Sequence, residues 1–257
     1  MHFNHRRLKT SMMKKEIFTV EKNIPLSKDI FSLTLAGDTS AITVPGQFVN
    51  IKIDGFFLRR PLSVCDAEKN RLTVVYRVAG VGTQKLSSMG ESETLELLTG
   101  LGNGFDLSRS GSRPLLIGGG LGFTPMFFLA RKFLEEGKKP VVLLGASRKE
   151  ELVWADRFRE IGAELIITTE DGSAGTKGFV TDAMPGIRYT YFYACGPEAM
   201  FNAVNAAASS DGEFSFEQRM GCGFGACMGC TCETVAGPKR ICKDGPVLKR
   251  GEIRWPI

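Results

Sequence analysis

Five of the seven cysteines in this 257-residue sequence lie between residues 222 and 242. Cys222, Cys227 and Cys230 have the spacing C-x4-C-x2-C, and Cys242 follows after eleven intervening residues. This is the plant-type spacing of a [2Fe–2S] cluster, in which each iron takes two protein thiolates and two bridging sulfides. The last interval is shorter than in a typical plant ferredoxin, which suits a compact C-terminal module. The sequence therefore predicts transfer of electrons one at a time.

Glycines are interleaved with these cysteines, at positions 221, 223, 225 and 229. Glycine adopts backbone angles that other residues avoid, so a short loop can wrap closely around a metal centre. The loop also leaves backbone N–H groups free to point at the cluster sulfurs, which raises the reduction potential.

Two alternatives to this ligand set arise from the same residues. A structural zinc ion also takes four cysteines, but usually as two close pairs, whereas Cys242 stands alone. Cys232 is a competing fourth ligand on local spacing alone. It sits two residues from Cys230, where an extended loop turns its side chain to the opposite side. We therefore expect Cys232 to be a spare thiol.

Two patterns of secondary structure must position these groups. Up to about residue 108, short β-like runs at hairpin-like spacing predict a small antiparallel barrel; the runs are 30–37, 47–53, 71–78 and 93–100. After residue 113, strands alternate with glycine turns and helices and predict a parallel α/β sheet; its strands are 114–120, 140–147, 164–169 and 190–194. We expect three domains at 14–110, 111–212 and 213–257, and a natural start at Met12 or Met13.

Two glycine turns of the second region end strands, where ligands bind in open α/β sheets. GGGLG (118–122) lies between a strand and a helix, and Cys195-Gly196-Pro197 ends a later strand. Glycines there let a phosphate approach N–H groups at the positive end of a helix. The first motif alone is also compatible with a tight turn that binds nothing. Two such turns in this order predict one shared crevice.

A third glycine motif lies in the barrel region, where RRPLSV (59–64) is followed by GVGT (80–83). A lone arginine is by default a surface charge. Next to Pro61 and Ser63, and before a glycine-rich turn that ends in Thr83, Arg60 instead favours a cradle for a phosphate and a ring edge.

The motif order RPLS, GVGT, GNGF, GGGLGFTP and CGPEAM resembles the ferredoxin reductase-like flavoproteins, which have an FAD barrel followed by a nicotinamide domain. The motifs CGFGACMGC and RICKDGP are similar to those in electron-transfer subunits of bacterial NAD-dependent dihydroorotate dehydrogenases. With them the resemblance covers nearly the whole chain, and Cys242 within CKDGP matches the family. The resemblance implies that FAD contacts Arg60, Pro61, Leu62, Ser63, Gly82 and Thr83. It also implies that NAD borders Gly119, Gly120, Gly122, Cys195, Gly196 and Pro197.

The resemblance also implies a function. Electrons would pass from a partner, an FMN-containing dihydroorotate dehydrogenase catalytic subunit, through [2Fe–2S] and FAD to NAD+, in a heterotetramer that oxidises dihydroorotate to orotate. One alternative is an FAD/[2Fe–2S] subunit of a sulfhydrogenase or of a ferredoxin–NADP reductase complex. An alternative of another class is a zinc-stapled, non-redox binding module. Glu170 and Asp171 favour an unphosphorylated ribose and Arg148 a phosphate, so only the resemblance favours NAD over NADP.

Composition and the remaining residues narrow the setting. The chain is 43% hydrophobic and 24% charged, and its net charge of +5 is scattered, which argues against a nucleic-acid partner. No apolar run approaches the ~18–20 residues of a membrane span, and no signal peptide is visible, so we expect a reducing cytoplasmic setting without disulfides. No Ser-His-Asp or paired-carboxylate arrangement is visible, and His2 and His5 lie in the probable leader, so no catalytic residue is expected. Cys65 is expected in the core, and Cys195 near the nicotinamide without a catalytic role.

Overall fold

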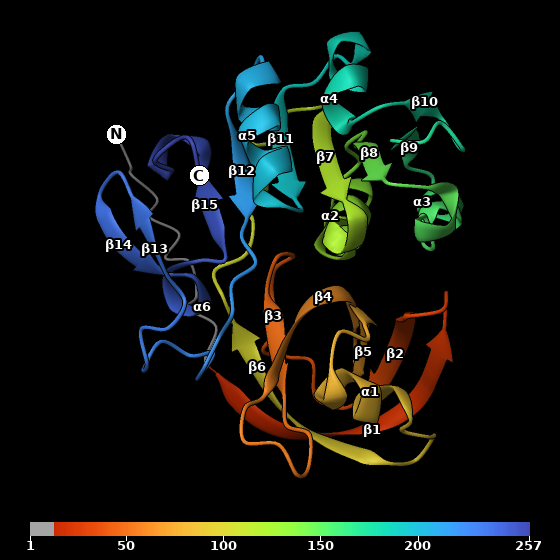
Figure 1. Ribbon diagram of the computed structural model, residues 1–257, viewed down its shortest axis with the longest axis vertical. Coiled ribbons are helices and arrows are strands. Elements are labelled where there is room, and N and C mark those ends of the chain that lie inside the picture. The colour runs from red at the N-terminus through yellow and green to blue at the C-terminus, as the bar shows by residue number, and fades with distance from the viewer. Residues whose placement is uncertain (1–12) are drawn as a thin grey trace.

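The computed structural model describes residues 13–257, so His2, His5 and Met12 lie outside the described residues. Its first part is a closed antiparallel barrel with the strand order β1-β2-β5-β4-β3-β6 (Figure 1). The strands are β1 (Lys14–Pro25), β2 (Ile30–Ala36), β3 (Phe48–Ile51), β4 (Arg60–Glu68), β5 (Arg71–Arg77) and β6 (Thr94–Leu101). The expected barrel is confirmed, and two of its strands, β1 and β4, were not predicted.

The two unpredicted strands carry many polar residues. In β1, Phe18 and Val20 point into the barrel while charged neighbours face solvent. In β4, the residues Arg60 to Ser63 are only half-buried. Charged and half-exposed residues weaken the hydrophobic signal of a strand, although the antiparallel partners on both sides hold it in place.

The second part is a seven-stranded sheet with the order β10-β9-β8-β7-β11-β12-β15. Its strands are β7 (Pro114–Gly119), β8 (Val141–Ala146), β9 (Glu164–Thr169), β10 (Thr176–Lys177), β11 (Tyr191–Cys195), β12 (Gly212–Ser215) and β15 (Val247–Lys249). All neighbours are parallel except β15, which runs antiparallel to β12. The expected parallel α/β sheet is confirmed.

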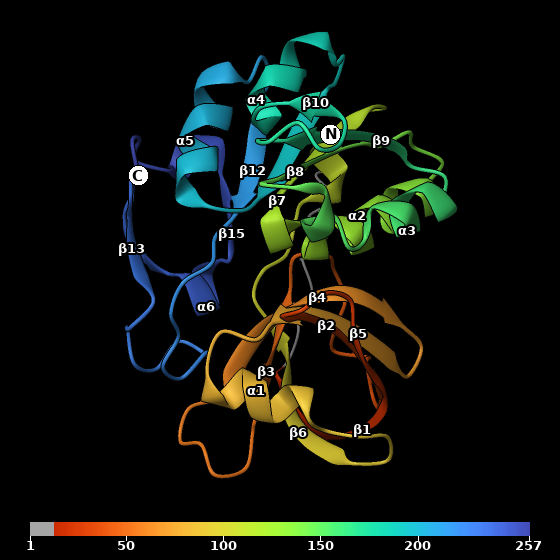
Figure 2. The ribbon, with the colours of Figure 1, turned by 45° about the vertical axis from the view of Figure 1, so that its right-hand side comes forward.

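Helices cover both faces of this sheet. On one face lie α2 (Phe123–Glu135) and α3 (Ala155–Glu160), and on the other α4 (Val180–Ala183) and α5 (Glu198–Ala207) (Figures 1 and 2). The strand side chains alternate accordingly: Leu116 packs with α2, whereas Leu115 and Ile117 pack with α4 and α5. No helix within residues 13–257 is long and apolar enough to cross a membrane.

The cysteine-rich segment lies between the last two strands of the sheet. After β12 the chain forms the cysteine loop, the hairpin β13 (Thr231–Thr234) and β14 (Gly237–Arg240), and α6 (Ile241–Asp244). It then returns to the sheet edge as β15. The expected boundary between residues 212 and 213 thus falls inside β12. Strands of three or four residues are too short to show a period, which is why they could not be predicted from the sequence.

Apolar packing joins the three parts, and ion pairs also connect the barrel with the sheet. Phe48 of the barrel, Ile117 of the sheet, and Cys230 and Cys242 of the cysteine-rich segment belong to one hydrophobic core. Between the barrel and the sheet, Arg131 on α2 donates from Nε to Asp66 on β4 over 2.9 Å, with little exposure of either side chain. The three parts therefore pack directly against one another.

Candidate redox-cofactor sites

The cysteine loop surrounds the sulfur of Cys222 with backbone donors. The N–H groups of Phe224, Ala226 and Cys227 donate to this sulfur over 3.5, 3.2 and 3.4 Å. The loop reaches this shape through positive φ angles of 77° at Gly223 and 93° at Gly225. Glycine adopts such angles without strain, which explains why these two positions are glycines.

Four of the cysteines are arranged as two pairs. The Cys222 N–H donates to Cys227 Sγ over 3.4 Å, and the Cys242 N–H donates to Cys230 Sγ over 3.4 Å. The loop that carries the first pair is bonded to the segment that carries Cys242, because Arg240 Nη1 donates to the Gly225 carbonyl over 2.7 Å, so the two pairs lie close together. Within residues 13–257, no three metal-ligating side chains gather closely enough for a single metal ion. Two thiols at each of two irons is the arrangement that a [2Fe–2S] cluster requires, so the residues fit this cofactor.

The two ends of this site differ in electrostatics. At Cys222, burial opposes ionisation, but the hydrogen bonds from Phe224, Cys227 and Ala226 prevail and lower its pKa to about 6. At Cys242, burial and the neighbouring Cys230 raise the pKa to about 12. Backbone donors therefore favour the thiolate at Cys222, whereas burial disfavours it at Cys242.

Cys232 is near Cys230 but faces a separate cavity. It is half-buried on β13, opposite Lys239 of β14. Its side chain lines a separate cavity of about 270 Å³ together with Glu198 and Phe216. Burial and the adjacent Glu233 raise the pKa of this thiol, so it stays protonated at neutral pH.

The RPLS motif lies on β4, where Arg60 faces the start of α1 (Val81–Ser87). A Cβ atom at Gly82 would approach Arg60 Nε to 2.6 Å, so only glycine lets the guanidinium lie against this turn. Arg60 also stacks over the Phe56 ring, 5.3 Å from its centroid. The neighbouring Arg59 pairs with Glu96, whereas Arg60 has no carboxylate partner among the described residues. A cation without an ion pair, beside the free N–H groups at a helix start, suits a pyrophosphate.

Thr83 shapes this turn with its hydroxyl group. Its Oγ1 accepts from the N–H groups of Ala79 and Gly80 over 3.0 and 3.2 Å and donates to the Gly80 carbonyl over 3.0 Å. The motif GVGT is therefore the first turn of a short helix as well as a glycine turn. The hydroxyl fixes the backbone donors of this turn.

We expect Arg60→Ala to lower the affinity for FAD about 10- to 150-fold, because one charge-assisted hydrogen bond contributes roughly 1.5–3 kcal/mol. The flavin retained after serial dilution and ultrafiltration measures the effect. Arg71→Ala is a matched control, because Arg71 lies on β5, pairs with Glu21 over 2.8 Å and lines neither cavity. Equal flavin retention by the Arg60→Ala variant and the wild type would contradict the assignment.

The two glycine turns of the sheet come together at the carboxyl ends of β7 and β11. A Cβ atom at Gly122 would collide with the carbonyl oxygen of Cys195, so glycine is required for the two turns to approach each other. Gly120 has a φ of +54° and faces open space, with no atom within 4 Å of a Cβ built there. Gly122 therefore shapes the crevice by packing, whereas Gly120 faces a ligand space.

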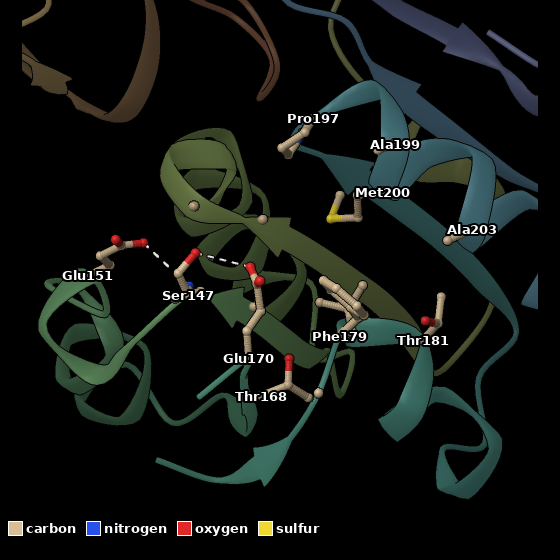
Figure 3. Close-up of a pocket in the computed structure, with 16 residues that line it drawn as sticks. Ser147, Glu151, Thr168, Glu170, Phe179, Thr181, Pro197, Ala199, Met200 and Ala203 are labelled. Carbon is tan, nitrogen blue, oxygen red and sulfur yellow. Dashed lines mark hydrogen bonds between the residues drawn. The ribbon is translucent and has the colours of Figure 1, made fainter. Parts of the chain in front are cut away.

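Two adjoining cavities start from these turns and share Gly119, Gly120 and Pro197. The first, of about 450 Å³, runs between α5 and the ends of β8 and β9 (Figure 3). The second, of about 490 Å³, reaches Arg77 of the barrel. Together the two cavities form an elongated space that passes the start of a helix and ends near the barrel strands assigned to FAD. Such a space suits a dinucleotide.

The far end of the first cavity carries a carboxylate. Ser147 Oγ and Glu170 Oε1 lie 3.0 Å apart, and both residues line the cavity (Figure 3). Asp171 instead accepts hydrogen bonds from Ser173. Arg148 lies toward Glu151 at 3.7 Å and lines a different cavity. Of the three candidates for ribose selectivity, only Glu170 lines the space, and a carboxylate there favours a free 2′-hydroxyl.

The two cysteines outside the cysteine-rich segment are buried. Cys195 is fully buried, and burial raises its pKa well above the usual range, so it packs beneath the crevice as an inert thiol. Cys65 is fully buried in the core against α2. Glu217 was not predicted as a site residue, and it lines the second cavity beyond the end of β12. Its side chain is open to the cavity, but surrounding protein raises the pKa of its carboxyl group by desolvation.

Comparison with known proteins agrees with this arrangement. A family model described as the iron–sulfur cluster binding domain of dihydroorotate dehydrogenase B matches residues 217–254, and an oxidoreductase NAD-binding domain matches residues 116–206. The electron transfer subunit of dihydroorotate dehydrogenase B (NAD(+)) from a Geobacillus species is 41% identical, covering 94% of this chain and 99% of the relative. The chain belongs to this family.

Other members and solved structures extend the comparison. The dihydroorotate dehydrogenase B electron transfer subunit of Fusobacterium nucleatum is 37% identical, again over 94% of this chain and 99% of the relative. A solved NADH-dependent reduced ferredoxin-NADP oxidoreductase, described for flavin-based electron bifurcation, is 30% identical with a TM-score of 0.84, covering 93% of this chain and 90% of its own. The ferredoxin reductase of a carbazole 1,9a-dioxygenase, at 20% identity, a TM-score of 0.65 and coverage of 76% and 65%, shares the fold.

Proposed function

We propose that this chain carries electrons from a partner catalytic subunit through a [2Fe–2S] cluster and FAD to NAD+ while that partner oxidises dihydroorotate to orotate. The observation that carries the proposal is the order of the three sites. The cysteine loop bonds to β3, β3 pairs with the RPLS strand β4, and the second cavity runs from the barrel to the glycine turns. The three proposed sites, for the cluster, FAD and NAD, thus follow one another within one chain.

The chemistry of the carriers explains this order. A nicotinamide exchanges electrons in pairs and an iron–sulfur cluster singly, so a flavin, which does both, belongs between them. The chain's own residues position these groups. Cys222, Cys227, Cys230 and Cys242 would hold the two irons, and Arg60 with the first N–H groups of α1 would hold the FAD pyrophosphate. The crevice beside Gly120 would admit the nicotinamide, and Glu170 at the far end would accept hydrogen bonds from the NAD ribose.

The partner and the setting complete the proposal. The named relatives are electron transfer subunits, which supports a separate catalytic subunit, here proposed to contain FMN and to form a heterotetramer with this chain. The alternative assembly, with a ferredoxin–NADP reductase, has weaker support because that relative is 30% identical against 41% for the dihydroorotate dehydrogenase subunit. We place the complex in the cytoplasm, where seven unpaired cysteines remain reduced.

The visible spectrum of the purified chain tests the proposed cofactors. We expect flavin bands with a reddish-brown shoulder from the cluster, and iron and sulfide in equal amounts at two of each per chain. NADH added without oxygen should bleach first the flavin bands and then the shoulder. A colourless protein that contains one zinc ion would instead indicate the non-redox binding module. Flavin without iron would remove the cluster from the proposal.

A further inference from the structure

Asn50 is a buried polar residue on the outer face of the barrel, between two of the proposed cofactor sites. Its side chain is on β3 and is 1% exposed. The neighbouring Val49 and Ile51 point into the barrel core, whereas Phe48 packs outside it with Cys230 and Cys242. Because side chains alternate along a strand, Asn50 shares the outward side with Phe48 and faces the cysteine loop.

The amide nitrogen of Asn50 holds the cysteine loop. Nδ2 donates to the carbonyl oxygen of Cys222 over 3.1 Å. Gly223 lies so close that a Cβ atom there would approach Asn50 Cγ to 3.1 Å. The orientation of the amide is determined by this contact, because reversing it would place two acceptors, Oδ1 and the Cys222 carbonyl, against each other.

The amide oxygen of Asn50 has no partner in the protein. Oδ1 is buried and has no hydrogen bond within the described residues. Buried acceptors are nearly always paired, so an unpaired one beside a cofactor site indicates a ligand donor. Leu, Ile or Val would fill this apolar position without leaving an unpaired group.

The strand beside Asn50 carries the RPLS motif. Asn50 is directly opposite Pro61, and Phe48 is opposite Ser63, in the antiparallel pairing of β3 with β4. Opposed residues on such strands share a face, with Cβ atoms about 4.5–5.5 Å apart. Asn50 therefore lies between the cysteine loop and the part of β4 assigned to the flavin.

We propose that Asn50 joins the two cofactor sites: Nδ2 holds the cysteine loop at Cys222, and Oδ1 accepts a hydrogen bond from an N–H or O–H group of the flavin. Asn50 is then a positioning residue, which fixes the separation between the flavin and the cluster through one rigid amide. This inference rests on the proposed FAD site and names a contact that the RPLS and GVGT motifs do not include.

Two substitutions distinguish the contact of Asn50 with the cysteine loop from its contact with the flavin. Asn50→Leu removes both hydrogen bonds at similar volume, so we expect about tenfold weaker FAD binding, the effect of one hydrogen bond, and an altered paramagnetic spectrum of the reduced cluster. Asn50→Asp keeps an oxygen toward the flavin but loses the donor to the Cys222 carbonyl, so its FAD affinity should stay within about threefold of the wild type while the cluster spectrum changes. Titration of the FAD-depleted, cluster-containing chain with FAD measures the affinity, and paramagnetic resonance reports on the cluster.

Thr99→Val is the matched control. Thr99 is on β6, fully buried, and its hydroxyl is also unpaired. The alternation along β6 turns it into the barrel, away from the cysteine loop. Thr99→Val should leave both the FAD affinity and the cluster spectrum unchanged.

Several outcomes would overturn the inference. If Asn50→Leu binds FAD as tightly as the wild type, Asn50 would only support the cysteine loop, whether or not the cluster spectrum changes. If Asn50→Asp or Thr99→Val loses as much FAD as Asn50→Leu, the loss of affinity would not come from Asn50 Oδ1, and the proposed hydrogen bond to the flavin would be wrong. A wild-type chain that takes up no FAD would instead contradict the proposed function, so the two failures are distinguishable.

Discussion

Serine in place of Cys242 is expected to abolish or severely perturb the paramagnetic signal of the reduced cluster, whereas serine in place of Cys232 is expected to leave it unchanged. Cys242 lies beside Cys230, and its N–H donates to that sulfur over 3.4 Å. Its loss would leave one iron with a single protein thiolate. Cys232 lines a different cavity. Resonance spectra of the dithionite-reduced chain, with iron and sulfide analysis, provide the measurement.

The comparison of these two serine variants contains its own control for folding. Both cysteines are near Cys230, but Cys242 is 2% exposed in the apolar core, so serine there also adds a buried hydroxyl. Thermal unfolding and flavin content should therefore be followed in both variants. A normal signal in Cys242→Ser together with loss in Cys232→Ser would identify Cys232 as the fourth ligand. Loss in both would mean that the signal reports general damage to the hairpin.

The isolated chain is expected to reduce artificial dyes with NADH but to convert no dihydroorotate. Co-expression with its FMN-containing partner should give a stable complex that forms orotate and NADH from dihydroorotate and NAD+. Within residues 13–257 the structure has cavities for a dinucleotide and a cysteine site for a cluster. These sites are assigned to electron carriers, so we assign the oxidation of dihydroorotate to the partner. Orotate absorbance and NADH formation, measured for each subunit and for the mixture, give the result.

The surface used for the partner is expected to be the rim of the cysteine loop. Phe224 and Met228 are 45% and 53% exposed there, and Cys227 is also exposed. A one-electron carrier must come close to the flavin that it serves, so hydrogen exchange at residues 223–229 should slow in the complex. Orotate formation by the chain alone would reveal an unrecognised substrate site. A partner that proves to be a hydrogenase or a sulfur reductase would keep the electron path and change its source.

The sequence by itself determined the chemistry, because that chemistry depends on local spacing. Cys222, Cys227 and Cys230 lie within nine residues, so their spacing alone limits which metal centre they can hold. The glycine turns are similar, since a strand that ends in glycines before a helix leaves free N–H groups whatever the rest of the chain does. The alternation of strands and helices after residue 113 likewise predicted the parallel sheet.

Only the tertiary structure decided how distant segments meet. The contact from Asn50 to Cys222 spans 172 residues, and nothing in either local sequence indicates it. The same holds for Gly122, whose need for glycine arises from the Cys195 carbonyl. Glu170 and Arg148 were equivalent candidates in the sequence, and only the direction of each side chain from the sheet edge separates them. Such choices depend on packing between elements, which local propensity and spacing do not encode.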